Sequence, residues 1–219
     1  MDTQGALELP PHYYRDNFLS LCDTVERQYR DLLTPVEASL VAVFRDMDFL
    51  AQCLYVRLVS RVGPWFREVK LDYPELGPLG PALDMLLESQ LAVVATELEV
   101  ADLGSLYTRP ELESMFGQHL QGARTRDKND LLQQLDELAL APAGLAELAA
   151  GWDGARIVAP LGGEIVDLLQ LLFFGNRRQG MTDFVLSDLG VARYYPYQLD
   201  PRNRLFPHRE ALDEYLACT

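Results

Sequence analysis

The sequence predicts a mainly α-helical protein with a minor β component. A winged-helix-like helical domain is followed by a small helical module and then by further helices with short hairpins. Three observations support this fold class. Apolar side chains recur every three or four residues over much of the chain, which is typical of helices with one buried face. Capping boxes and prolines mark helix starts, and runs of β-prone residues are short.

The first three helices are predicted by apolar spacing and by caps. Residues 13–33 carry apolar side chains three and four positions apart, as expected of one helix with a single buried face. A second helix begins at the capping box of Thr34 and Glu37 and runs to about Asp46. A third helix spans residues 49–61 and is ended by a Gly-Pro pair.

Two short β-prone runs follow and frame a fourth helix. Residues 65–71 alternate weakly and favour an extended conformation, a helix starts at about Leu79, and residues 91–95 form a second β-prone run. The order helix, helix, strand, helix, strand over roughly 65 residues is typical of a winged helix or a related helix-turn-helix unit. A generic α+β bundle is the alternative that the pattern leaves open.

A second module begins near residue 102. Thr108 and Glu111 form another capping box, and a basic, Gly-containing loop then leads to a helix that starts at Lys128. This pattern predicts two short helices joined by an extended loop. An Ala-rich link is expected over residues 139–151. Three further helices are expected after it, over residues 164–174, 181–190 and 208–219.

Composition limits the class of protein. The chain has 219 residues, of which 48% are hydrophobic and 24% charged, as in folded globular proteins of one large or two small domains. No apolar run is long enough to span a bilayer and no secretory signal is present, so no membrane partner is expected. Three distant cysteines indicate a reducing compartment, and no Cys or His stands at zinc-ligand spacing.

Glu68-Val69-Lys70 has the spacing of half of a metal-dependent nuclease site. Such a site also needs an upstream Asp, usually after Pro, to hold Mg²⁺. No Pro-Asp precedes Glu68, so the tripeptide is interpreted as a polar surface segment. The sequence therefore predicts no catalytic residue and no metal ligand in this chain.

Basic residues gather in a few places although the net charge is −14. An acidic total disfavours nucleic-acid binding, but local positive clusters can dock a phosphate backbone. The alternative is that these are solvated charges paired with nearby acids. The candidate DNA-binding residues are Arg57, Arg61, Arg67, Lys70, Arg124, Arg126, Lys128, Arg177 and Arg178.

Three long blocks carry a family resemblance. Residues 13–37, 54–76 and 173–200 resemble the N-terminal half of the Fanconi-associated nuclease family, and residues 106–135 resemble that family's SAP module. The resemblance implies three segments: an N-terminal winged-helix-like domain (1–100), a SAP-like DNA-binding module (101–140), and a helical region (141–219) leading toward a helical repeat domain. The family's VRR-type nuclease domain is expected to be absent from this chain.

The resemblance also implies a function. The N-terminal region of the family grips flapped or branched duplex DNA, and a downstream nuclease domain cuts near a 5′ flap in interstrand cross-link repair. That domain uses Mg²⁺ or Mn²⁺, so no cofactor is expected in this chain, which alone is expected to be inactive. The downstream repeat and nuclease domains are expected partners. The resemblance places Arg61 at a DNA-gripping position, beside Val62 where relatives often carry a second basic residue, and matches Lys128 to the lysine that begins the second SAP helix.

Two other function classes stay open from the sequence alone. One is a stand-alone winged-helix regulator that binds nucleic acid, and the other is a protein-interaction scaffold, which the acidic surface permits. The expected location is a bacterial cytoplasm, associated with the nucleoid, or the nucleus if the source is eukaryotic.

Overall fold

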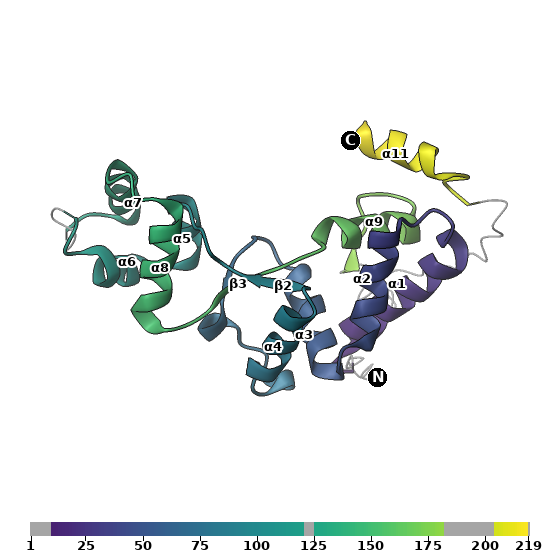
Figure 1. Cartoon of the computed structure of the whole chain (residues 1–219), viewed down its shortest axis with the longest axis horizontal. Helices are drawn as coiled ribbons and strands as arrows, with labels where there is room; N and C mark the ends of the chain where they lie inside the picture. The colour runs from purple at the N-terminus through teal and green to yellow at the C-terminus, as the bar shows by residue number, and fades with distance from the viewer. Residues whose placement is uncertain (1–9, 121–124, 182–203, 219) are drawn as a thin grey trace, which may run out of the picture. The chain divides into compact units, whose positions relative to one another are not determined.

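The computed structural model describes residues 10–120, 125–181 and 204–218. Helices dominate it, and its strands form one small sheet, so the predicted mainly α fold with a minor β part is confirmed (Figure 1). The chain divides into two compact units. The first is made of residues 1–61, 74–91 and 161–219, and the second of residues 62–73 and 92–160.

The first unit is helical. Its helices, with a 3-10 turn η2, are α1 (Tyr13–Tyr29), α2 (Pro35–Asp46), α3 (Phe49–Val59), η2 (Pro74–Leu76), α4 (Gly80–Glu88), α9 (Gly163–Phe174) and α11 (Arg209–Ala217). The predicted capping box at the start of α2 is present, since Thr34 accepts from the Glu37 amide and Glu37 from the Thr34 amide. Asp48 caps α3 by a single bond, since its carboxylate accepts from the Ala51 amide.

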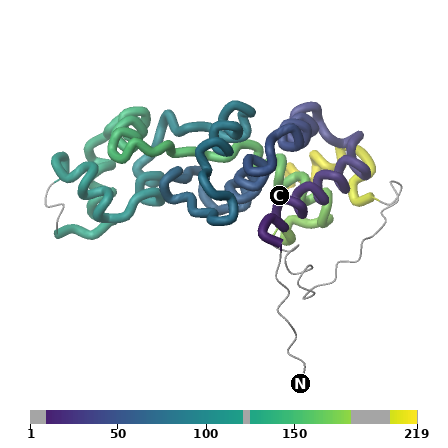
Figure 2. Tube along the Cα trace, turned by 90° about the horizontal axis from the view of Figure 1, so that it is seen from below, coloured from purple at the N-terminus to yellow at the C-terminus, as the bar shows by residue number. Residues whose placement is uncertain are grey.

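Aromatic side chains from three helices fill the centre of this unit. The ring centroids of Phe18 and Phe44 are 4.8 Å apart and those of Phe44 and Tyr55 are 5.8 Å apart. The Tyr55 hydroxyl donates to the Leu161 carbonyl at 2.9 Å, which satisfies its polar end and holds the segment before α9. Helix α1 packs on α3 and on α9, so chain segments distant in sequence share one core (Figure 2).

The junction between α2 and α3 is held by a buried glutamine. Gln52 Nε2 donates to the carbonyls of Phe44 and Met47, at 2.9 and 3.1 Å. These carbonyls lie at the end of α2, where no further helical turn satisfies them. Arg15 Nε donates to the side-chain oxygen Oε1 of Gln52 at 2.8 Å. The oxygen and the nitrogen of the Gln52 side-chain amide are therefore both hydrogen-bonded.

The described residues of the second unit form a sheet, a 3-10 turn and several α-helices. Its elements are β1 (Phe66–Arg67), η1 (Glu68–Lys70), β2 (Ala92–Val94), α5 (Val100–Leu106), α6 (Arg109–Phe116), α7 (Lys128–Glu137), α8 (Pro142–Asp153) and β3 (Ile157–Pro160). The order of strands is β1-β3-β2, and both pairings are antiparallel. Leu112, Phe116, Leu131 and Leu135 are fully buried in the core of the helices.

Three details differ from the sequence prediction. The two predicted β-prone runs each pair with β3, a strand that the sequence analysis did not predict. The sequence analysis expected a link over 139–151, where the structure forms most of α8. Extended structure also stops at Arg67, after which η1 begins. The predicted helix over 181–190 falls almost wholly outside the described residues.

Candidate nucleic-acid interface

Arg57, on α3, lies in a contact with two other segments of the first unit. Its guanidinium donates twice to Glu75 and lies 4.0 Å over the ring of Tyr14. The side chain is about one-third exposed, at 33%. Burial would raise the pKa of Glu75, but the hydrogen bond from Arg57 lowers it. These contacts give Arg57 a structural role.

Three other candidates of the first unit are at the surface. Arg61 follows α3 and is exposed, and the neighbouring Val62 is fully exposed. Arg177 and Arg178 are exposed in the loop after α9, where Asn176 accepts from the Arg178 amide at 2.9 Å. Exposed guanidinium groups of this kind can reach a phosphate without breaking a buried contact.

Glu68, the acid of the Glu-x-Lys tripeptide, is bound by an arginine of the second unit. Arg156 donates to both of its carboxylate oxygens at 2.8 Å, in a bidentate pair. No group of three or more metal-binding side chains occurs in the part of the chain that the structure describes. A carboxylate held by arginine in this way is not arranged as a metal ligand.

Arg67 is buried although it is only three residues from exposed Lys70. Its side chain is 3% exposed and donates to Glu111 at 2.8 Å and to Asp153 at 2.5 Å. Its guanidinium lies 4.1 Å over the ring of Tyr107. The structure therefore gives the Arg67 guanidinium protein partners on both its edge and its face.

Glu111 joins this cluster to α6. One carboxylate oxygen accepts from the backbone and hydroxyl groups of Thr108, at 2.7 and 2.8 Å, which forms the predicted capping box. The other oxygen faces Arg67 and also Lys70, whose Nζ is 3.4 Å away. Burial alone would raise the pKa of Glu111, but the hydrogen bonds from Arg67 and Thr108 lower it to about 2. The Lys70 side chain stays 59% exposed.

The start of α7 differs from a simple anion site. Asp127 caps the helix by accepting from the Asp130 amide at 2.9 Å, so a carboxylate already occupies this end. Lys128 donates to the Gly104 carbonyl in the last turn of α5, which ties α5 to α7. Arg126 is exposed. Arg124 lies outside the described residues.

Arg109 is a basic residue that the sequence analysis did not select. It begins α6, pairs with Glu113 at 2.9 Å and donates to the backbone carbonyl of Arg126 at 2.8 Å. This bond brings the chain before α7 to the first turn of α6. A basic residue next to a capping Thr was the signal that could have identified it.

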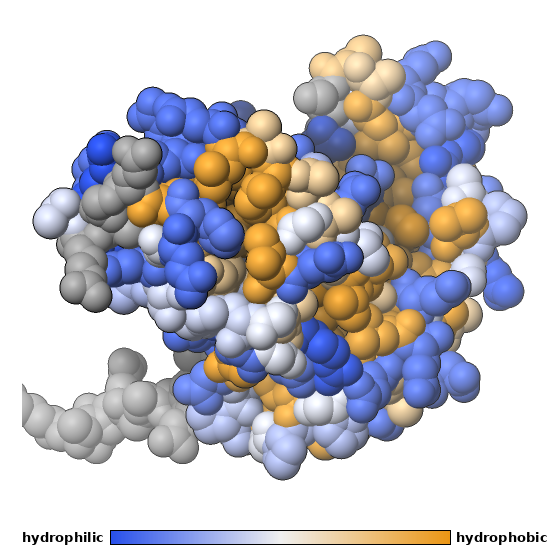
Figure 3. All heavy atoms as spheres, turned by 60° about the vertical axis from the view of Figure 1, so that its left-hand side comes forward, coloured by the Kyte–Doolittle hydropathy of each residue, from blue (hydrophilic) through white to orange (hydrophobic). Residues whose placement is uncertain are grey.

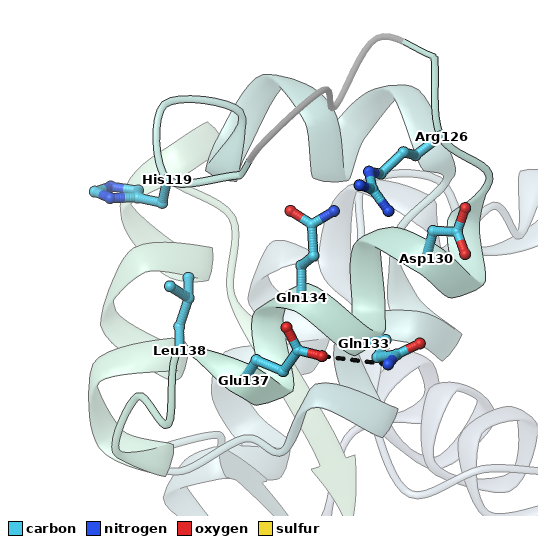
Figure 4. A pocket seen from close by; sticks show the side chains of 7 residues that line it. All are labelled: His119, Arg126, Asp130, Gln133, Gln134, Glu137 and Leu138. Carbon is cyan, nitrogen blue, oxygen red and sulfur yellow. Dashed lines mark hydrogen bonds between the residues drawn. The ribbon is translucent and has the colours of Figure 1, made fainter.

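Close to Arg126 lies a polar hollow of about 440 Å³ (Figure 4). Two carboxylates and two amides line it, with Gln133 donating to Glu137 at 3.2 Å. Its acids oppose the single arginine, so the hollow does not have the charge of a phosphate site.

The surface also carries apolar side chains between its charges. Figure 3 shows hydrophobic patches among hydrophilic side chains on the face that it presents. Exposed valines and leucines of the second unit are Val62, Val69, Val93, Val94, Leu138, Leu140 and Leu148. In the described residues no helix is long and apolar enough to cross a bilayer.

Comparison with known proteins places the chain in a family. Residues 12–93 match a family model described as FAN1, HTH domain, and residues 97–154 match the Fanconi anemia-associated nuclease SAP domain. A Fanconi-associated nuclease 1 homolog of Pseudomonas aeruginosa is 37% identical over 207 residues, which are 94% of this chain and 36% of the relative. The chain belongs to the Fanconi-associated nuclease family.

Eukaryotic members of the Fanconi-associated nuclease family match over a similar stretch. The homolog of Arabidopsis thaliana is 28% identical over 97% of this chain and 25% of the relative, and human Fanconi-associated nuclease 1 is 32% identical over 94% and 23%. The chain thus spans about a third or less of the length of these relatives. Two crystal structures of paFAN1 also match, both at a TM-score of 0.83.

These two family structures hold DNA. In one, paFAN1 is bound to 5′-flap DNA with a flap of 2 nucleotides and a gap, and it is 34% identical over 96% of this chain and 38% of the paFAN1 chain. In the other structure the flap has 1 nucleotide, and paFAN1 is 35% identical over 94% of this chain and 38% of the paFAN1 chain.

Proposed function

We propose that this chain is the DNA-binding part of a structure-selective flap nuclease, and that it grips duplex DNA beside a 5′ flap by the phosphate backbone. The observation that carries the proposal is its similarity, over nearly its whole length, to paFAN1 in two complexes with flapped DNA. A match to a SAP domain supports the same function.

The placement of basic side chains supports phosphate contacts by only part of the candidate set. Exposed guanidinium and ammonium groups occur at Arg61, Lys70, Arg126, Arg177 and Arg178. Phosphate contacts are strongest where a cation reaches the backbone without losing a buried partner. Arg57 is only one-third exposed and Arg67 is buried, so we assign them to the framework of the interface.

We further propose that the full-length protein cuts DNA through a VRR-type nuclease domain with Mg²⁺ or Mn²⁺, in interstrand cross-link repair. The described residues do not fit such a metal, because no cluster of three metal-binding side chains occurs among them and Glu68 is paired with Arg156. We therefore assign DNA holding, and no step of hydrolysis, to the residues of this chain.

The proposal is tested by binding of the purified chain to fluorescein-labelled 5′-flap DNA, measured by fluorescence anisotropy between about 50 and 200 mM salt. We expect the logarithm of the affinity to fall by roughly 0.9 per log unit of salt for each phosphate neutralised. The double variant Arg61→Glu, Arg126→Glu is expected to bind more weakly and with a smaller slope, because both side chains are exposed.

The charge-matched control is the double variant Arg27→Glu, Arg30→Glu, at two exposed arginines at the end of α1 outside the candidate set. Equal DNA binding by the tested double variant and this control would contradict the assignment of the tested residues to the DNA-binding surface. A defined sequence preference on linear duplex DNA would instead favour a stand-alone winged-helix regulator. No detectable DNA binding at low salt would favour a protein-interaction scaffold.

A further inference from the structure

The Arg67 side chain is only 3% exposed, because its protein partners surround it. Two carboxylates occupy its terminal nitrogens, at 2.8 Å for Glu111 and 2.5 Å for Asp153. The ring centroids of Tyr107 and Trp152 lie 4.1 and 5.4 Å from its guanidinium carbon, Cζ. A phosphate cannot reach the terminal nitrogens of Arg67 without displacing the carboxylates that already bind them.

The partner that Arg67 shares with Lys70 is Glu111. The same carboxylate oxygen, Oε1, lies 2.8 Å from Arg67 and 3.4 Å from Lys70. Glu111 is itself fixed, because its second oxygen accepts two hydrogen bonds from Thr108 at the start of α6. Lys70 is therefore drawn toward the first turn of α6 while most of its side chain stays in solvent.

A third segment reaches the same turn. Arg109, the first residue of α6, donates to the backbone carbonyl of Arg126 at 2.8 Å. Arg109 thereby ties the chain before α7 to this turn, and its guanidinium also pairs with Glu113 at 2.9 Å. Buried Arg67 shares its charge between Glu111 and Asp153, and Lys70 adds an exposed cation at this turn.

We propose that Arg67 and Glu111 are positioning residues, which hold Lys70 at the first turn of α6 so that Lys70 meets a DNA phosphate there. This inference rests on the proposed function. Lys70 lies within the stretch that matches the HTH model, 12–93, but it acts together with the SAP module, 97–154. A residue within the HTH match is thereby held in place by a residue within the SAP match.

The test is a double-mutant cycle in the full chain, with anisotropy on 5′-flap DNA. Lys70→Ala removes the contact, and we expect affinity to fall about tenfold. Arg67→Lys keeps the charge but cannot bridge two carboxylates, so we expect a similar loss. If Arg67 acts through Lys70, the double variant binds no more weakly than Lys70→Ala alone. Losses that multiply would overturn the proposal.

Glu111→Gln gives a second test, in which the two explanations predict opposite signs. Gln still completes a capping box, so α6 keeps its start. If Glu111 were only an acid near DNA, loss of its charge would tighten binding. A positioning role predicts weaker binding. The matched control is Glu113→Gln, one turn along α6, which is expected to tighten binding, and tighter binding by both variants would overturn the proposal.

A measurement without DNA separates this inference from the proposed function. The Glu68 amide donates to the Arg156 carbonyl and the Leu71 amide to the Glu68 carbonyl. In Arg67→Lys we expect hydrogen exchange of these amides to accelerate, while amides of α3 keep their rates. Unchanged exchange near Lys70 would overturn the positioning role. Loss of DNA binding by the unmodified chain would refute only the proposed function.

Discussion

Arg57 and Glu75 are joined by two hydrogen bonds that converge on one carboxylate oxygen, from Nε at 3.2 Å and from Nη2 at 2.6 Å. The hydroxyl of Tyr14 donates to the same oxygen at 3.3 Å, and the ring of Tyr14 lies under the guanidinium at 4.0 Å. Three segments of the first unit, α1, α3 and η2, therefore meet at a single ion pair.

Arg57→Ala is expected to lower the free energy of unfolding by about 1–3 kcal/mol, because it removes a charged hydrogen-bond partner and a ring contact. Urea denaturation measures the change. Arg30→Ala, at an exposed arginine, should stay within about 0.5 kcal/mol of the unmodified protein. Unchanged stability of Arg57→Ala together with a smaller salt slope for DNA binding would make Arg57 a phosphate contact instead.

Gly162→Ala is expected to destabilise the first unit for two reasons. The residue has a φ of +81°, which costs an L side chain about 1–2 kcal/mol. A Cβ there would also lie 2.2 Å from Leu40 Cδ1 and 3.2 Å from the Tyr55 hydroxyl. We expect a total loss of about 2–4 kcal/mol, measured by thermal or urea denaturation.

The neighbouring glycine provides the matched control. Gly163 is the first residue of α9, and a Cβ there would meet open space. Gly163→Ala should be neutral or stabilise the protein by up to about 1 kcal/mol. Equal effects of the two substitutions would contradict the role given to the contact with Leu40.

Local features of the fold were predictable from the sequence because their partners are close in the chain. Both predicted capping boxes are present, since Thr34 and Glu37 are three residues apart, as are Thr108 and Glu111. Strand β3 was not predicted. Its residues Ile157 and Val158 pair with β1, about 90 positions earlier, and no local pattern specifies that pairing.

The candidate site was harder to predict, because exposure depends on distant partners. Arg67 and Lys70 read alike in the sequence, yet one is 3% and the other 59% exposed. The difference comes from Glu111 and Asp153, which are 44 and 86 residues from Arg67. The spacing of residues within a basic cluster does not predict which distant acidic residues pair with them.

Arg209→Ala is expected to loosen α11 without changing α2. Arg209 donates to Glu37 at 2.6 Å and to the Leu32 carbonyl at 2.9 Å. Loss of both bonds should make the amides of α11 exchange roughly tenfold faster, as expected for a charged hydrogen bond. Glu214→Ala, at an exposed position of the same helix, should change exchange little. Equal acceleration in α2 would instead indicate that the whole unit is destabilised.

Acid is expected to weaken the second unit through Glu111. Burial opposes its ionisation, but the hydrogen bonds from Arg67 and Thr108 prevail and lower its pKa from 4.5 to about 2. The ionised form is therefore favoured by folding. Its contribution to stability is complete above about pH 4.5 and is lost as the pH falls toward about 2.

Glu111→Gln isolates this contribution, because a glutamine does not titrate. The free energies of unfolding of the two proteins, from urea denaturation at several pH values, should differ most above pH 4.5 and converge as the pH approaches 2. Asp153, whose pKa Arg67 also lowers against the effect of burial, is present in both proteins. A difference that stays constant over this range would show that the Glu111 carboxylate is not preferentially ionised in the folded state.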